Sequence, residues 1–220
     1  FAVRAVARVR AVRPDCRVLC DPVLGDDPKG LYIEAAAAEA IRDVLAPLAG
    51  VLTPNRFELA WLTGTAIARL DDAVHATQAL ANAVVVVTSA ARDDGHEVAL
   101  APASPPRGQA GCGTVEGGGG RGNLNCDGAG DLLTLLTVHG AAFVAATSWQ
   151  PSVPHGAGDL FAGLMLGHML NAKGEREAMA RTVAGLVAAI DTSAGRDELA
   201  LAAGMPAIAA APPWSIRRLA

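Results

Sequence analysis

Aromatic residues and cysteines are scarce in this chain of 220 residues. Aromatic side chains make up 4% of the sequence although 51% of it is hydrophobic, so we expect a core built from Ala, Val and Leu. The cysteines form no CxxC pair, and no histidine lies at zinc-finger spacing from them, which argues against a structural zinc site. We expect reduced thiols, as in a cytoplasmic protein. The cysteines are Cys16, Cys20, Cys112 and Cys126.

Long apolar runs and basic runs are absent as well. No segment of eighteen residues is both apolar and free of Gly, Pro and charge, so the sequence predicts no transmembrane helix. The formal net charge is −4, which argues against nucleic acid or an anionic membrane as the main partner.

The start of the chain, FAVRAVARVRAVRP, has neither an initiator Met nor the apolar core and cleavage site of a signal peptide. The pattern is that of the middle of a helix, without a start signal, so we expect an upstream part to be missing. Its arginines have the spacing of a solvated helix face, and a binding arm is the alternative. These arginines are Arg4, Arg8, Arg10 and Arg13.

Strand and helix patterns alternate along the first half of the chain. Within residues 16–25 a short buried strand is predicted that ends in a loop with Asp21 and Pro22, and further strands are predicted at 51–55, stopped by Pro54, and at 83–90. Helices are predicted at 32–50, 56–64 and 70–82, the last with Asp71 or Asp72 as its cap. Four consecutive valines, at 84–87, are typical of a strand buried on both faces. This order predicts an α/β fold with a mainly parallel sheet flanked by helices on both sides.

The pattern changes after this strand. Residues 102–130 are rich in Gly and Pro, which predicts a flexible loop or an insertion. No Gly-Lys-Ser/Thr follows these glycines, so the segment is not a P-loop. The stretch LLTLLTVHGAAFVAATSW predicts a hairpin around His139 and Gly140. Helices are predicted at 158–171, 175–190 and 196–203, and the chain is expected to form a single domain over 1–220.

The tetrapeptide GAGD occurs twice. The copy at 128–131 leads into LLTLLTVHG, which favours a strand, whereas the copy at 156–159 leads into LFAGLMLGHML, which favours a helix. Only the second copy therefore places Gly156, Ala157 and Gly158 at a helix N-terminus. Unpaired N–H groups and the helix dipole make that end a site for a phosphate, and small residues let the phosphate come close.

Asp159 lies in the first turn of this predicted helix, at the edge of the anion site. A carboxylate in that place can accept the proton of an alcohol that attacks phosphorus. The alternative is that Asp159 only caps the helix, which is a common role of aspartate.

Four motifs in this chain resemble those of the pyridoxal kinases, within the ribokinase-like fold. They are CDPVLGD, TPNRFELAWLTG, VVVVTSA and PHGAGDLFAG, in the family's order and spacing. GAGD is shared across ribokinase-like enzymes, whereas CDPV with TPNRFEL and VTSA is similar to the narrower branch of vitamin B6 and hydroxymethylpyrimidine kinases. DELALAA and the closing IRRL favour the B6 side. The resemblance covers most of the chain except the Gly-rich segment.

The resemblance implies a catalytic role for the second GAGD. Asp159 would be the base for the 5′-hydroxymethyl group of pyridoxal, and the N–H groups of Gly156, Ala157 and Gly158 would form an anion hole for the transferred phosphoryl group. The implied co-substrate is ATP with Mg²⁺, assisted by a monovalent cation, in a homodimeric cytoplasmic protein.

The resemblance also implies a nucleotide and metal site. Asn55 and Glu58 match an Asn-x-x-Glu element that organises Mg²⁺ through water, and Asp21 would face the phosphates and the metal ion. Thr53 and Thr88 would line the same cleft, at the carboxyl ends of strands. His155 would contact the substrate.

Taken from the residues alone, other interpretations stay open. Asp21 before a proline is also a turn former, Glu58 is also a surface residue of a helix, and Thr88 also ends a strand. His155 is also an ordinary loop residue.

The sequence departs from the family before CDPV. The residues that hold the pyridine ring and a lid strand in the family have no counterpart here, so the resemblance implies an N-terminally truncated chain in which part of the sheet is absent. Two alternatives to a pyridoxal kinase therefore stay open: a hydroxymethylpyrimidine (phosphate) kinase, and a non-catalytic nucleotide-binding remnant.

Overall fold

The computed structural model describes residues 1–93, 131–150, 152–171 and 174–219. The predicted Gly-rich loop at 102–130, with Cys112 and Cys126, lies outside the described residues. Cys16 and Cys20 are free thiols, and burial raises the pKa of Cys20 to about 11. No helix in the described ranges has the length and apolar character needed to cross a bilayer.

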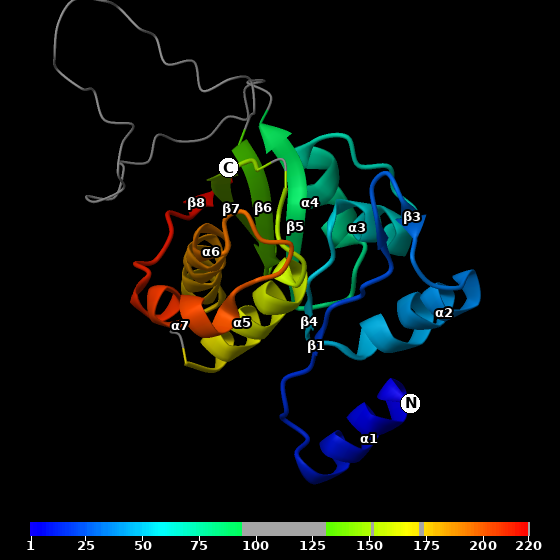
Figure 1. Ribbon diagram of the computed structural model, residues 1–220. Coiled ribbons are helices and arrows are strands. Elements are labelled where there is room, and N and C mark those ends of the chain that lie inside the picture. The colour runs from blue at the N-terminus through cyan, green and yellow to red at the C-terminus, as the bar shows by residue number, and fades with distance from the viewer. Residues whose placement is uncertain (94–130, 151, 172–173, 220) are drawn as a thin grey trace, which may run out of the picture.

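A six-stranded sheet forms the centre of the fold, and its two halves run differently (Figure 1). The strand order is β1 (Leu19–Cys20), β4 (Val51–Leu52), β5 (Val84–Asp93), β6 (Asp131–Val138), β7 (Ala141–Ser148) and β8 (Arg217–Arg218). The strands β1, β4 and β5 are parallel, as predicted, whereas β6, β7 and β8 are antiparallel to their neighbours. The α/β class is confirmed, and the whole sheet is mixed.

The antiparallel half begins with the predicted hairpin. His139 and Gly140 connect β6 to β7 and have φ angles of 49° and 77°. Positive φ at both central residues is the geometry of a tight type I′ turn, which joins strands that must run antiparallel. This short connection explains why the sheet does not stay parallel throughout.

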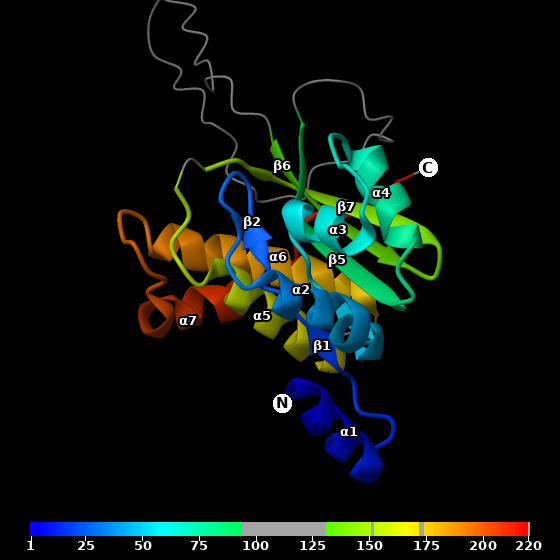
Figure 2. The same ribbon diagram turned by 90° about the vertical axis from the view of Figure 1, so that its right-hand side faces the viewer.

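Helices cover the sheet on both sides (Figures 1 and 2). One side carries α2 (Ala35–Ala40), α3 (Arg56–Thr63) and α4 (Leu70–Gln78), and the other carries α5 (Ala157–Asn171), α6 (Glu175–Thr192) and α7 (Leu201–Ala210). Val85 and Val87 lie in the core with α3 and α4, whereas Val84 and Val86 lie in the core with α5 and α6. Since successive side chains of a strand point to opposite faces, the four valines serve both cores, as predicted.

Two short elements lie outside this sheet. The strands β2 (Gly25–Asp26) and β3 (Gly30–Leu31) form a separate antiparallel ribbon that contacts α3. The helix α2 is followed by a π turn (Ile41–Leu45) and a 3-10 turn (Ala46–Leu48), so the helix predicted at 32–50 is real but starts later.

The first helix, α1 (Ala2–Val12), lies away from the sheet in Figure 1 and has no buried residue. Arg4, Arg8 and Arg13 are exposed, as expected for a solvated face. Arg10 is half-buried and donates to the carbonyl of Leu48 over 2.7 Å, which ties the helix to the rest of the fold.

Two local predictions were wrong. The last helix was predicted at 196–203 but is α7, Leu201–Ala210. The reason is that the backbone before it pairs with His155: His155 N–H donates to Asp197 O (2.7 Å) and Leu199 N–H donates to His155 O (3.4 Å).

The cap of α4 also differs from the prediction. Its N-cap residue is Arg69, and Asp72, in the first turn, accepts the N–H groups of Arg69 (2.9 Å) and Ala68 (3.0 Å). A carboxylate in this position satisfies the free N–H groups before the helix without being the N-cap itself.

Candidate active site

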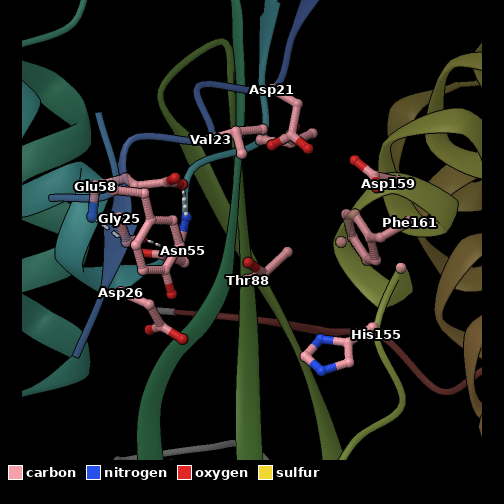
Figure 3. Close-up of a pocket in the computed structure, with 14 residues that line it drawn as sticks. Asp21, Val23, Gly25, Asp26, Asn55, Glu58, Thr88, His155, Asp159 and Phe161 are labelled. Carbon is pink, nitrogen blue, oxygen red and sulfur yellow. Dashed lines mark hydrogen bonds between the residues drawn. The ribbon is translucent and has the colours of Figure 1, made fainter. Parts of the chain in front are cut away.

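The predicted site residues come together in one pocket of about 380 Å³ (Figure 3). It lies where β1, β4 and β5 end, facing the N-terminus of α5, which is where open α/β sheets bind ligands. Every residue predicted for the site lines it except Ala157; they are Asp21, Thr53, Asn55, Glu58, Thr88, His155, Gly156, Gly158 and Asp159.

The two GAGD copies differ as predicted. The first ends at Asp131, which starts β6, and the second opens α5, which starts at Ala157. Gly156 has a φ of 90°, a conformation that favours glycine. A Cβ atom on Gly158 would meet no atom within 4 Å, so the space above the helix end is open.

Asp159 lies in the first turn of α5, and Figure 3 shows its carboxylate pointing toward Asp21 across the pocket. Within the described part of the chain, this carboxylate accepts no hydrogen bond. A capping aspartate accepts a backbone N–H of its own helix, so Asp159 is not a cap here. Its oxygens are available to a ligand.

Asp21 follows β1 and lies across the pocket from Asp159. Thr53 Oγ1 donates a hydrogen bond to its Oδ1 over 3.1 Å. Burial raises the pKa of Asp21 to about 6; the bond from Thr53 opposes this rise, and the charges of Glu58 and Asp159 add to it. Asp21 is therefore more than a turn former, because its side chain bonds across the site.

Glu58 is not a surface residue, since it is only 4% exposed. Its Oε2 accepts the N–H of Asn55 (2.9 Å) and Asn55 Oδ1 accepts the N–H of Glu58 (2.9 Å), a reciprocal capping box at the start of α3. Burial raises the pKa of Glu58, and hydrogen bonds from the backbone of Asn55, Leu24 and Gly25 oppose this rise.

Thr88 and His155 occupy the remaining sides of the pocket. The N–H of Thr88 donates to Pro54 O over 2.9 Å, which joins the end of β5 to the loop before α3. The register of β5 shifts between Val87 and Ala91, where Ser89 has a φ of 52°. Such a bulge next to a site turns side chains out of the regular alternation. His155 is exposed and lies in the loop before α5.

Five further residues line the pocket that the sequence did not single out: Val23, Gly25, Asp26, Tyr32 and Phe161. Asp26 stands in the CDPVLGD motif, and Tyr32 is the single tyrosine of the chain, so both left a signal. Val23 stands in the same motif, but nothing in the sequence indicates its φ of 46°, because a β-branched residue in that conformation is strained and is held there by its surroundings.

The pocket is rich in negative charge. Its lining contains the carboxylates of Asp21, Asp26, Glu58 and Asp159, and no Lys or Arg among the described residues. No three acidic, His or Cys side chains in the described ranges are arranged to hold a metal ion by themselves. A polyanionic ligand would therefore need to bring a cation, and a hard ion that keeps several water ligands suits these oxygen donors.

A second hollow of about 600 Å³ also borders the α5 N-terminus. It shares His155, Gly156 and Asp159 with the first pocket. The rest of its lining is mostly apolar: Leu160, Gly163, Leu164, Glu198, Leu199 and Leu201.

Gly25 is expected to tolerate no side chain. A Cβ atom there would collide with the carbonyl oxygen of Gly30 and lie 2.7 Å from Cε1 of Phe57. We expect Gly25→Ala to lower the free energy of unfolding by about 1–3 kcal/mol, because the ribbon must move away from α3. Urea unfolding measures this change.

Gly167→Ala is the matched control, since a Cβ atom on Gly167 meets nothing within 4 Å. It should leave stability unchanged or raise it by about 0.5–1 kcal/mol, as glycine disfavours a helix interior. Equal stability of the Gly25 and Gly167 variants would show that the ribbon is not tightly packed.

The chain is similar in sequence to known kinases, as the geometry of the site suggests. A family model described as phosphomethylpyrimidine kinase matches residues 2–101. Pyridoxal kinase PdxY of Rubrobacter xylanophilus is 29% identical over 98% of this chain and 66% of its own length. The pyridoxine/pyridoxal/pyridoxamine kinase of Bordetella avium is 34% identical over 96% of this chain and 62% of its own length. The chain thus spans slightly less than two thirds of these relatives.

Solved structures show the same fold. Pyridoxal kinase from Leishmania donovani in complex with ADP superposes with a TM-score of 0.75 at 21% identity, over 99% of this chain and 69% of that one. Pyridoxal kinase from Entamoeba histolytica superposes with a TM-score of 0.73 at 18% identity, over 99% and 68%. The chain is therefore similar in sequence to pyridoxal kinases and has the fold of these solved structures.

Proposed function

We propose that this chain transfers the γ-phosphoryl group of ATP to the 5′-hydroxymethyl group of pyridoxal. The observation that carries the proposal is the carboxylate of Asp159, which accepts no hydrogen bond within the described part of the chain and lies at the glycine-rich N-terminus of α5. The names of the relatives support the substrate, and one solved neighbour carries ADP together with pyridoxine.

The start of α5 suits a transferring phosphoryl group. The N–H groups of Gly156, Ala157 and Gly158 donate to no carbonyl among the described residues, whereas Leu160 N–H already donates to Gly156 O over 2.9 Å. Free N–H groups at the positive end of a helix stabilise the charge that develops on the equatorial oxygens in the transition state.

Asp159 then acts as the base. It accepts the proton of the substrate hydroxyl while the hydroxyl oxygen bonds to the γ-phosphorus and the bond to the β–γ bridging oxygen breaks. The products are a phosphate monoester and ADP, and Asp159 returns its proton to solvent.

The acidic lining fits Mg²⁺, which in such a site neutralises phosphate charge. Asp21 and Asp26 are the carboxylates that would hold it, since they lie in the pocket without a basic partner among its lining residues. The monovalent cation, the homodimer and the cytoplasmic location implied by the resemblance stay predictions.

The second hollow suits the base of the nucleotide. It opens from the same helix end, so a nucleotide whose phosphates lie at Gly156–Asp159 can place its base there. Its leucines, Leu160, Leu164, Leu199 and Leu201, offer the apolar walls that an aromatic ring requires.

Two rival functions have specific support. The family model favours a phosphomethylpyrimidine kinase, which can use the same base and anion site. A chain that binds a nucleotide without transferring phosphate would use the same helix N-terminus and the second hollow.

The test is phosphoryl transfer by the purified chain with Mg-ATP, offering pyridoxal and hydroxymethylpyrimidine in parallel, with ATP binding measured by calorimetry. Formation of phosphorylated pyridoxal alone is expected. Phosphorylated hydroxymethylpyrimidine alone would establish the first rival, and ATP binding without either product would establish the second.

A further inference from the structure

Both carboxylate oxygens of Glu58 are engaged by backbone N–H groups from two separate segments. Its Oε1 accepts the N–H of Leu24 over 2.7 Å, and its Oε2 accepts the N–H of Asn55 over 2.9 Å. Leu24 and Glu58 are 34 residues apart, so the first bond is a tertiary contact and the second is the capping box of α3.

Asn55 completes this arrangement. Its Oδ1 accepts the N–H of Glu58, and its Nδ2 donates to Gly25 O over 2.8 Å. The hydrogen bond that Glu58 accepts from Leu24 and the one that Asn55 donates to Gly25 therefore hold both residues at the start of α3. We call this set of residues, Leu24, Gly25, Asn55 and Glu58, the clasp.

The turn that these hydrogen bonds reach has a strained backbone. Leu24 is fully buried, and the residue before it, Val23, has a φ of 46°. A β-branched residue in the left-handed region is strained and persists only where its surroundings impose it. The turn carries Asp21 on one side and Asp26 on the other, both facing the pocket.

Figure 3 shows Glu58 beside Asn55 and Gly25, on the side of the pocket opposite Asp159. The oxygens of Glu58 point at the backbone of the turn, and the side chain is 4% exposed. A carboxylate that is buried and already accepts hydrogen bonds from N–H groups is stabilised by them as a charge, so it has little need of a hydrated cation as a further partner.

We propose that Glu58 is a positioning residue. It holds the Val23–Gly25 turn so that Asp21 and Asp26, on either side of the turn, line the pocket, in place of organising a metal ion through water. The kinetic consequence rests on the proposed function, whereas the structural consequence does not.

The two backbone N–H groups require a hydrogen-bond acceptor at each of the two side-chain oxygen positions of residue 58. Glutamine at this position keeps the shape but presents an NH₂ group to one of the N–H donors, so one bond is lost and two donors face each other. Aspartate keeps the charge but is one methylene shorter, so it cannot span from α3 to both donors.

The first measurement is amide hydrogen exchange in metal-free protein, for wild type, Glu58→Gln and Glu58→Asp. We expect the Leu24 amide to exchange about tenfold faster or more in both variants, because a lost hydrogen bond of this kind lowers the local opening free energy. Leu24 exchange unchanged in both variants would overturn the proposal.

Asp72→Asn is the matched control. Asp72 belongs to a similar capping box, at the start of α4, but contacts no residue of the clasp. Its substitution should speed exchange at Arg69 and leave Leu24 unchanged. Faster exchange at Leu24 in this control would show a general loosening of the fold and would overturn the inference.

The second measurement separates positioning from metal binding. In the kinase assay, Glu58→Gln is expected to lower kcat about 10–100-fold, while the Mg²⁺ concentration for half-maximal rate stays within about twofold of wild type. A large rise in that concentration, with rate restored by excess Mg²⁺, would assign Glu58 to the metal. If wild type itself transfers no phosphate, the proposed function fails, and hydrogen exchange alone still decides the role of Glu58.

Discussion

Replacing Asp159 with asparagine is expected to lower kcat for phosphoryl transfer by about 10²–10⁴-fold, which is the usual contribution of a general base. Asparagine has the same shape as aspartate, and the carboxylate accepts no hydrogen bond within the described part of the chain, so the fold loses no contact. The affinity for ATP should change little, because the N–H groups of residues 156–158 remain. Steady-state kinetics and calorimetry measure the two quantities separately.

Asp131→Asn is the control for this experiment. Asp131 ends the other GAGD copy but starts a strand and is exposed, outside the lining of the pocket. Its substitution should leave kcat unchanged. If Asp159→Asn kept its rate within a few-fold of wild type, the base would be another group. If it lost ATP binding instead, Asp159 would act in binding and not in proton transfer.

Asp21→Asn is expected to lower activity and to raise the stability of the metal-free chain, in a way that depends on pH. Burial raises the pKa of Asp21 from 3.8 to about 6, so the folded chain holds a proton there that the unfolded chain has lost. Stability of the wild type should therefore fall as pH rises from about 4 to about 6, and the cost should remain fully present above that window.

Asparagine removes this charge and can still accept the hydrogen bond from Thr53. The gain in unfolding free energy should be near zero at pH 4 and about 1–2 kcal/mol at pH 8, after allowance for partial exposure of the site. Thermal unfolding across pH 4–8 measures it. Mg²⁺ should stabilise the wild type more than the variant, because it binds the ionised carboxylate.

Asp43→Asn is expected to lower the free energy of unfolding, which is the opposite of the effect expected for Asp21→Asn. Arg42 donates two hydrogen bonds to Asp43 and lowers the pKa of that carboxyl, so the substitution should lose stability at neutral pH, and less at low pH. Since the pair is on the surface, the change should be small.

Parallel stability curves for wild type and Asp21→Asn from pH 4 to pH 8 would contradict the prediction for Asp21, because they would mean that Asp21 titrates normally.

Much of the site could be predicted from local chemistry. The Leu, Met and Ala content after the second GAGD favours a helix, and the Thr-rich stretch after the first favours a strand, so residue type alone distinguished the two copies. The parallel strands β1, β4 and β5 follow from the alternation of strands and helices, and their carboxyl ends must then meet at one edge of the sheet.

Other parts depended on distant contacts. The helix predicted at 196–203 was displaced because the backbone of Asp197 and Leu199 pairs with His155, more than forty residues earlier. Tyr32 was placed in a helix because the alanines that follow it favour one, whereas α2 begins only at Ala35. In both cases the local preference was outweighed by hydrogen bonds or packing that the local pattern does not contain.

The sequence by itself determined the class of fold, the helix that presents Asp159 and the order of the motifs around it, since these depend on side-chain type within a few turns of chain. The tertiary structure alone decided that Val23 adopts a left-handed conformation and that Glu58 is buried with both oxygens bonded. The reason is physical: a hydrogen bond between residues 34 positions apart exists only once the sheet and α3 have packed, and that packing sets where each charge in the pocket points.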